Sequence, residues 1–457
     1  MASFYFALRS SFAREGVISM RIRLFLKRFL FAAAVAAVFI VPGVWLFFTW
    51  EKIPSSIRVT QGQQVLSLDV PVRGEIYLEQ KSNETQQLVE TISEADVQPA
   101  MSGQVLQVDL SQPLTVKSSV SQNYKMDVKL FGFIPFKTVD LQVVPQQTLI
   151  PAGVPIGIYI RTDGVMVIGQ GEFEGENHAV KAPAKHILQE GDYILKVNGE
   201  AVEKKAQLLD LIAESEGKEL VLTIRREEET FDVKVTPEKN ADGEYKLGIW
   251  IRDNAQGVGT MTFLTEDFCF GALGHGINDT DTAELMELKS GSLYKTKIVS
   301  VKKGEGGSPG ELTGVIDYNP DNKIGVISNN SVEGIFGSLS EEIASEITTE
   351  AMPIGYKQDV ELGKAQILCC VDGSTVPAYY DVEITGIRLE HDNVNRGLEL
   401  KVTDAELLLQ TGGIVQGMSG SPIIQNGKLV GAVTHVLVND PTRGYGIFIE
   451  NMLDTAG

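Results

Sequence analysis

The sequence predicts a mainly β protein that follows an N-terminal transmembrane helix. Three observations support this fold class. An apolar stretch of 22 residues lies near the N-terminus. After it, short segments of alternating apolar and polar residues are separated by turns that contain glycine. The chain has 457 residues, 45 glycines and 43% hydrophobic content, which is enough for two to four domains with separate cores.

The charge is distributed unevenly along the chain. Residues 1–50 carry a net charge of about +5, whereas the whole chain carries −20. The remaining residues are therefore strongly acidic. This balance argues against nucleic-acid binding, because that depends on cationic side chains that neutralise phosphates.

Residues 29–50 form the apolar stretch, and the cationic segment 1–28 precedes it. At 1.5 Å per residue, 22 helical residues reach about 33 Å, which is enough to cross the roughly 30 Å hydrocarbon core. The positive-inside rule predicts that residues 1–28 are cytoplasmic and that everything after Trp50 lies outside. The alternative is a cleavable signal peptide, but this stretch is longer than usual and lacks a clear A-x-A end.

Residues 53–145 alternate apolar and polar positions, as in Ser56-Ile57-Arg58-Val59-Thr60. This pattern predicts a small β-rich domain. We interpret it as a spacer between the membrane and the rest of the chain.

Residues 146–240 contain the segment Gly191-Asp192-Tyr193-Ile194-Leu195-Lys196-Val197-Asn198-Gly199. It resembles the GD-x-I-x-x-x-NG hairpin of PDZ domains, and a helix is expected at about 204–215. Such domains bind peptides by strand addition, with backbone N–H groups of an entry loop taking a terminal carboxylate. The candidates for that loop are Ile156, Gly157 and Ile158. The alternative is that these three are ordinary strand residues.

Residues 247–457 are strand-rich with many glycine turns, and near their end lies Gly417-Met418-Ser419-Gly420-Ser421-Pro422. Chymotrypsin-like proteases need a glycine two positions before the nucleophilic serine, so that both N–H groups enter one oxyanion hole. Gly417 and Ser419 have this spacing. The alternative is that this segment has no catalytic role and is only a tight turn before a hairpin. The length of about 210 residues fits a chymotrypsin-like protease of two β-barrels.

A serine nucleophile needs a neighbouring base, and His275 is the strongest candidate because it lies in a glycine-rich apolar stretch. His435, on a strand after the serine, is a rival base, although we interpret it as lining the specificity cleft. The base needs an orienting carboxylate. Asp279, Asp281 and Asp404 all qualify, and spacing alone does not choose among them.

No cofactor and no metal are predicted. The five histidines show no metal-binding pattern, and Cys269, Cys369 and Cys370 have neither metal-ligand spacing nor the number that a disulfide framework needs. A disulfide from Cys269 to Cys369 or Cys370 is the alternative to three free thiols.

The segment 402–446, with the segments around His275 and Phe131, closely resembles the SpoIVB peptidases of endospore-forming bacteria, which are membrane-anchored serine proteases with a PDZ domain. The resemblance covers nearly all of the chain after the anchor. It implies a triad of His275, Asp404 and Ser419. One departure from the general chymotrypsin pattern is Met418, where an aspartate usually pairs with the new N-terminus of an activated zymogen.

The resemblance also implies a biological role. Such peptidases are made in the forespore and act between the two spore membranes, where they cleave a regulator of an intramembrane metalloprotease and so release sigma-K activation. The expected partners are this protein substrate, the membrane, and a peptide or C-terminal ligand at the PDZ domain, with the chain itself as one candidate. Two rival interpretations are a quality-control protease of the HtrA type, in which the PDZ domain follows the protease, and a non-catalytic PDZ scaffold or sensor.

Overall fold

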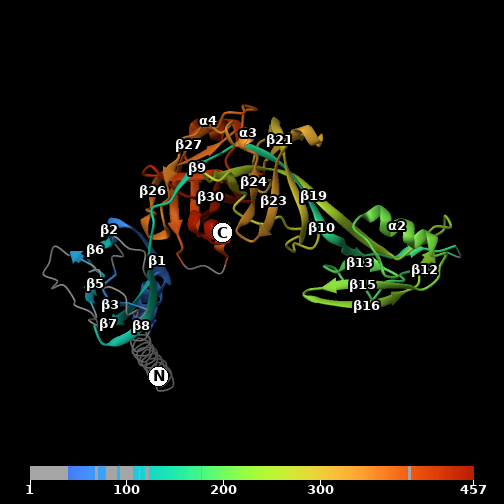
Figure 1. The fold of residues 1–457 in the computed structure, drawn as a ribbon, viewed down its shortest axis with the longest axis horizontal. Helices are drawn as coiled ribbons and strands as arrows, with labels where there is room; N and C mark the ends of the chain where they lie inside the picture. Colours follow the sequence, from blue (N-terminus) through green and yellow to red (C-terminus); the bar gives the residue numbers. More distant parts are fainter. Residues whose placement is uncertain are drawn as a thin grey trace, which may run out of the picture. The chain divides into compact units, whose positions relative to one another are not determined.

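The computed structural model describes residues 40–66, 70–78, 90–92, 106–112, 114–118, 123–176, 178–389 and 393–456 (Figure 1). The described residues divide into two compact units, one made mainly from residues before 142 and one mainly from residues 142–457. Nearly all of the elements are strands, as predicted from the alternating pattern.

Residues 40–52 are helical, and large apolar side chains on this helix, including Phe47 and Phe48, are exposed. Among the described residues, no helix has both the length and the apolar character needed to cross a membrane. The predicted span begins earlier, and its residues 29–39 lie outside the described residues, as does the cationic segment 1–28.

The predicted spacer region is rich in strands. In one sheet β8, β7, β3 and β5 are neighbours in that order, and Met126, Val128, Val139 and Leu141 are buried in its core. The strands of this region are β1 (Ser56–Thr60), β2 (Gly62–Leu66), β3 (Arg73–Leu78), β4 (Glu90–Ile92), β5 (Leu106–Asp109), β6 (Leu114–Ser118), β7 (Asn123–Leu130) and β8 (Ile134–Val144).

The first barrel is a closed ring of six strands. Its order is β10-β21-β23-β24-β20-β19, and pairing of β10 with β19 closes the ring. Its elements, with short neighbours, are β9 (Thr148–Pro151), β10 (Pro155–Gln170), β19 (Ile249–Leu264), β20 (Cys269–Ala272), β21 (Leu288–Lys302), β22 (Glu311–Ile316), η1 (Pro320–Asn322), β23 (Lys323–Ser331), β24 (Gly334–Leu339), α3 (Glu341–Ala344), β25 (Met352–Pro353) and η2 (Lys357–Asp359).

The second barrel is also closed, in the order β26-β27-β28-β31-β30-β29. The prediction of two barrels is therefore confirmed. Its elements are β26 (Gly363–Cys369), β27 (Ala378–Ile387), η3 (Val394–Arg396), β28 (Leu398–Val402), α4 (Ala405–Thr411), β29 (Pro422–Gln425), β30 (Lys428–Leu437), β31 (Asp440–Phe448) and α5 (Ile449–Ala456).

The PDZ domain is inserted into the first barrel and does not precede it. Strand β10 pairs with β21 through residues 156–162 and then with β13 through Val165 and Met166. Strand β19 brings the chain back into the barrel. The predicted boundaries at 146, 240 and 247 therefore differ from the structure, because two 16-residue strands serve both domains.

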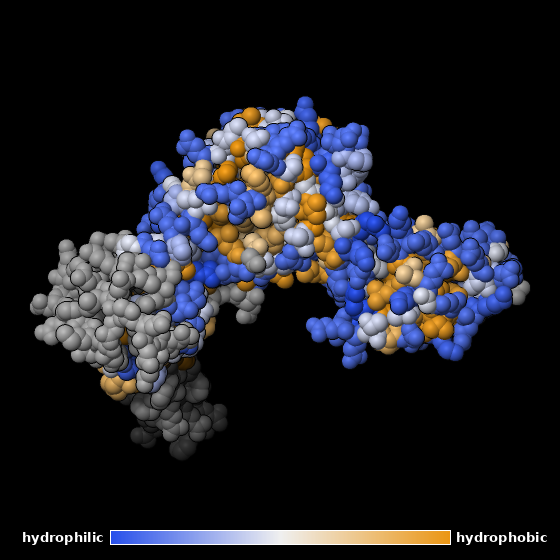
Figure 2. All heavy atoms as spheres, viewed as in Figure 1, coloured by the Kyte–Doolittle hydropathy of each residue, from blue (hydrophilic) through white to orange (hydrophobic). Residues whose placement is uncertain are grey.

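The other PDZ elements are β11 (Phe173–Glu174), β12 (Val180–Lys181), β13 (Tyr193–Val197), β14 (Glu200–Ala201), α2 (Lys205–Glu214), β15 (Leu220–Arg226), β16 (Glu229–Val235), β17 (Glu238–Lys239) and β18 (Tyr245–Lys246). Asn198 and Gly199 form the expected hairpin turn, with φ of 51° and 85°. Leu208 and Ile212 of α2 are buried against this sheet. Figure 2 shows apolar side chains gathered over part of this domain, with hydrophilic ones around them.

Candidate active site

The serine lies on a loop between α4 and β29. Gly417 and Gly420 have φ of 95° and 96°, a region that favours glycine, so the loop needs glycine on both sides of Ser419. A Cβ atom at Gly420 would lie 2.0 Å from the carbonyl oxygen of Thr260. The glycine spacing noticed in the sequence is therefore a requirement of the backbone.

Met418 anchors this loop. Its side chain is fully buried in the core of the second barrel. Where an aspartate would need a charged partner, the methionine needs only apolar contacts. Methionine in place of the usual aspartate at position 418 thus fits the apolar core in which the side chain lies.

The N–H groups of Gly417 and Ser419 are available as oxyanion donors. In the described part of the chain neither donates a hydrogen bond to a protein atom. The peptide plane before each is fixed through its carbonyl, because the N–H and C=O of a trans peptide point in opposite directions. The carbonyl of Gln416 accepts from the N–H of Leu312 at 2.8 Å, and that of Met418 accepts from the N–H of Ser421 at 3.0 Å.

Strand β19 of the first barrel holds the same loop. The N–H of Thr260 donates to the carbonyl of Ser419 at 2.9 Å, and the Thr260 hydroxyl donates to the carbonyl of Gly417 at 2.8 Å. One residue of the first barrel thus fixes two carbonyls of the loop that carries the nucleophile.

His275 follows β20 in the first barrel, after Leu273 and Gly274, which both have φ of 68°. Its Nδ1 lies 2.8 Å from the carbonyl oxygen of Gly276. A carbonyl only accepts, so Nδ1 carries the proton and Nε2 keeps its lone pair, the tautomer that a general base needs. Burial lowers the pKa of His275 below its ordinary value, against a smaller opposing effect of the Gly276 carbonyl, so the ring is neutral at pH 7.

The structure brings the His275 and Ser419 loops together. A Cβ atom at Gly420 would lie 2.5 Å from the N–H nitrogen of Leu273, and one at Gly274 would lie 3.1 Å from Cγ2 of Thr434. The Ser419 hydroxyl donates to the carbonyl of Thr434 at 2.7 Å. It does not donate to His275 in this structure, so it must rotate before the histidine takes its proton.

His435 lies beside His275, with 5.0 Å between the ring centroids. Its pKa is lowered to about 4, first by desolvation and then by charge repulsion from His275 and Arg396. As predicted, it lies on a strand, β30, that follows the nucleophile.

Asp404 is the N-cap of α4. Its Oδ1 accepts from the N–H groups of Glu406 and Leu407 at 2.9 and 3.0 Å, and its Oδ2 accepts from the N–H of Asp381 at 3.3 Å. No described hydrogen bond joins Asp404 to His275. Its role as the orienting carboxylate stays a prediction, and the structure gives the carboxylate a different task.

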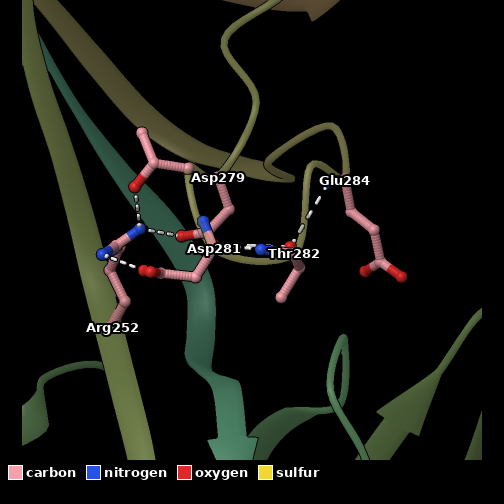
Figure 3. Close-up of polar contacts among 6 residues, drawn as sticks. Arg252, Asp279, Asp281, Thr282 and Glu284 are labelled. Carbon is pink, nitrogen blue, oxygen red and sulfur yellow. Dashed lines mark hydrogen bonds and ion pairs between the residues drawn. The ribbon is translucent and has the colours of Figure 1, made fainter.

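Asp279 and Asp281 bind Arg252 of β19 (Figure 3). Asp279 is fully buried and also accepts from the N–H groups of Asp281 and Thr282 at 2.9 and 3.0 Å. Burial raises its pKa, but these hydrogen bonds and Arg252 outweigh burial and leave the pKa below its ordinary value. Both aspartates therefore order the loop after His275 and have no described bond to its ring.

The structure contradicts the predicted peptide loop of the PDZ domain. Ile156, Gly157 and Ile158 pair with β19 on one side and with β21 on the other, inside the first barrel. A Cβ atom at Gly157 would lie 2.3 Å from Oγ1 of Thr296. Their backbone groups are used by the barrel, and the alternative of ordinary strand residues is the correct one.

A free sheet edge lies elsewhere in the PDZ domain. Residues 249–252 of β19 pair with β10 on one side, and no described strand pairs with the other side. Asp253 accepts from the N–H of Lys205 at 2.8 Å, which brings the start of α2 to this strand. The sequence signal for this edge is the apolar-glycine-apolar run Leu247-Gly248-Ile249, which was not among the predicted sites.

Among the described residues no group of three or more His, Cys, Asp or Glu side chains is arranged to hold a metal ion. Cys369 and Cys370 are buried free thiols, and Cys269 is an exposed free thiol.

Residues 243–453 match the family model of the SpoIVB peptidase S55, and residues 179–226 match that of a PDZ domain. The chloroplastic membrane metalloprotease ARASP of Arabidopsis thaliana is 32% identical over 80 residues, 16% of this chain and 18% of that protein. The chain thus spans less than a fifth of this relative's length.

Two solved structures are similar to parts of the chain. The inactive form of the Rv3671c protease, from Mycobacterium tuberculosis, is 13% identical, with 44% of this chain and 84% of that chain covered and a TM-score of 0.26. The PDZ domain of an SdrC-like protein from Listeria monocytogenes is 20% identical, with 20% and 87% covered and a TM-score of 0.17.

Proposed function

We propose that this chain, a PDZ-containing serine endopeptidase of the SpoIVB S55 type, is a sporulation signalling protease that cleaves a regulator of an intramembrane metalloprotease and thereby triggers sigma-K activation. The observation that carries the peptidase chemistry is the pair of free N–H groups at Gly417 and Ser419, on a loop fixed through its carbonyls. The signalling role rests on the resemblance to the SpoIVB family.

The first chemical step is acylation of Ser419. Nε2 of His275 takes the proton as the serine oxygen attacks the scissile carbonyl. The oxygen of the tetrahedral intermediate accepts hydrogen bonds from the N–H groups of Gly417 and Ser419. Because their peptide planes are already fixed, little reorganisation is needed as the charge develops.

His275 then donates its proton to the leaving amine, and the cycle is repeated with water as the attacking group. The imidazolium formed in each step is disfavoured by burial, so a group that stabilises it would speed both steps. The prediction from the family resemblance assigns this task to Asp404.

The PDZ domain would take an extended peptide beside residues 249–252 of β19. A free strand edge next to a helix is the arrangement that strand addition uses. Ile249 and Ile251 pack against the PDZ core that contains Leu208 and Ile212, so this strand is held in place by the core of the domain. The ligand is a peptide or C-terminal segment, with the chain itself as one candidate.

The site of action would be outside the cytoplasmic membrane, in the space between the two spore membranes. The cationic segment before the apolar stretch supports this orientation through the positive-inside rule. The exposed apolar side chains of residues 40–52 suit a helix that continues a membrane anchor.

The test is cleavage of the regulator by the full chain in detergent, compared with Ser419→Ala, followed by a sigma-K reporter in sporulating cells that carry either form. The proposal predicts a cut regulator and an active reporter with the wild type alone. An intact regulator, in a preparation that a fluorophosphonate labels at Ser419, would overturn the signalling role and leave the peptidase. It would also favour quality-control proteolysis, the HtrA-type alternative.

A further inference from the structure

Asn395 lies between the two loops that carry the candidate base and nucleophile. It belongs to η3 of the second barrel and is 6% exposed. A buried amide is costly unless its polar atoms are bonded, so the partners of this side chain are informative.

The Asn395 amide nitrogen donates to the carbonyl of Gly274 at 2.6 Å and to the carbonyl of Val332 at 2.8 Å. Both acceptors belong to the first barrel. Two carbonyls can only accept, which establishes that the atom facing them is the nitrogen. The Gly274 carbonyl belongs to the peptide that leads into His275, so Asn395 fixes the backbone immediately before the base.

The same residue also binds the strand that faces Ser419. The Thr434 hydroxyl donates to the backbone carbonyl of Asn395 at 2.6 Å, and the Thr434 carbonyl accepts from the Ser419 hydroxyl at 2.7 Å. A continuous path of hydrogen bonds therefore runs from the peptide before His275, through Asn395 and Thr434, to the nucleophile.

On the far side of His275 a second asparagine acts within the first barrel. Asn330 accepts from the N–H of Ile277 at 2.8 Å and donates to the carbonyls of Ile277 and Met286 at 3.1 and 2.8 Å. Of the two asparagines that hold the His275 loop, Asn395 is the one that spans the barrels.

We propose that Asn395 is a positioning residue for the peptidase reaction, which sets the place of the His275 loop in the first barrel relative to Ser419 in the second. This inference rests on the proposed peptidase function. Small displacements between a base and its nucleophile reduce rates strongly, so loss of these bonds should slow the chemistry more than substrate binding.

The test is the kinetics of fluorophosphonate inactivation with the full chain, which separates the maximal inactivation rate from the concentration needed for half of it. Asn395→Asp keeps the shape of the side chain and removes its N–H donors. Asn395→Ala removes both the shape and the donors. The expected result is a fall in the maximal rate of about tenfold or more in both variants, with little change in the half-saturating concentration. Asn240→Ala is the matched control, because Asn240 is also 6% exposed but lies in the PDZ domain.

Thr434→Ser and Thr434→Val give a second pair. Serine keeps the hydroxyl that donates to Asn395, so it should lose less rate than valine, which should lose rate as Asn395→Asp does. Wild-type rates in folded Asn395→Asp, or equal effects of the two Thr434 variants, would overturn the inference. If the folded wild type is itself unlabelled, the proposed peptidase function fails, which is a distinguishable result.

Discussion

The His275 ring is neutral in this structure because burial lowers its pKa and no described carboxylate opposes that effect. A base with a lowered pKa stays unprotonated to a lower pH. In the pH profile of the fluorophosphonate inactivation rate, the midpoint of the acid limb should therefore lie below pH 6.5, the ordinary histidine pKa. A limb clearly above pH 6.5 would show that a carboxylate stabilises the imidazolium.

Asp404 can be tested by two substitutions that separate its two roles. Asparagine is also a good N-cap, so Asp404→Asn should keep both stability and activity if the residue only caps α4. Asp404→Ala should cost about 1 kcal/mol of unfolding free energy, measured by denaturant titration. If Asp404 instead orients His275, Asp404→Asn should lower turnover on the order of 10⁴-fold with unchanged stability.

The serine loop shows how an element can be predicted from a short motif. Gly417, Ser419 and Gly420 were recognisable because the backbone allows few alternatives at these positions. The carbonyl partners of the loop, Thr260 and Leu312, come from strands more than 100 residues earlier in the chain. No local pattern marks such partners, so Thr260, Leu312 and Asn395 could not be predicted from the sequence.

The oxyanion loop predicts that Gly417→Ala is far more damaging to activity than to folding. A Cβ atom there would lie 2.9 Å from Cβ of Leu312, so the Gly417 peptide must shift. Turnover should fall on the order of a hundredfold, as for loss of one oxyanion donor. Gly427→Ala is the control, since Gly427 also has a positive φ, 72°, but no atom within 4 Å of a new Cβ. Equal activity losses in the two variants would contradict the assignment.

The loop after His275 depends on one cation from β19. Arg252→Met would leave the fully buried Asp279 without its ion-pair partner. Removing one partner of a buried pair typically costs about 3–5 kcal/mol. We expect a less stable first barrel and a lower labelling rate, measured by thermal unfolding and fluorophosphonate kinetics. Arg226→Met, which breaks the ion pair with Asp192 within the PDZ domain, is the comparison. Arg226→Met should destabilise the PDZ domain without lowering the labelling rate. If Arg252→Met is labelled as fast as the wild type, Arg252 has no role in positioning the base.

At the scale of the whole molecule, the two barrels and the PDZ domain were predictable from strand patterning and from the GD-to-NG segment. The insertion of one domain in the other was not. Polar residues interrupt β10 at residues 161–163 and β19 at residues 252–254, but nothing local shows that each strand continues from the barrel into the PDZ domain. The same continuity misplaced the peptide loop at residues 156–158.

The insertion predicts that the peptidase domain cannot be produced from the boundary at residue 247. A fragment of residues 247–457 lacks β9 and β10, and with them Ala152, Ile156, Ile158 and Ile160 of the first barrel core. This fragment should show no cooperative unfolding and no fluorophosphonate labelling. A fragment of residues 146–457 should unfold cooperatively and should be labelled. A cooperative, labelled fragment 247–457 would show that the first barrel closes without β10.

The central claim is that His275 activates Ser419 for attack on a peptide bond, and fluorophosphonate labelling of the full chain tests it most directly. Mass spectrometry should find the adduct on Ser419 in the wild type, and Ser419→Ala and His275→Ala should both lose labelling while remaining folded. A folded wild type that stays unlabelled, or an adduct on another residue, would contradict the account and favour a PDZ scaffold without catalysis.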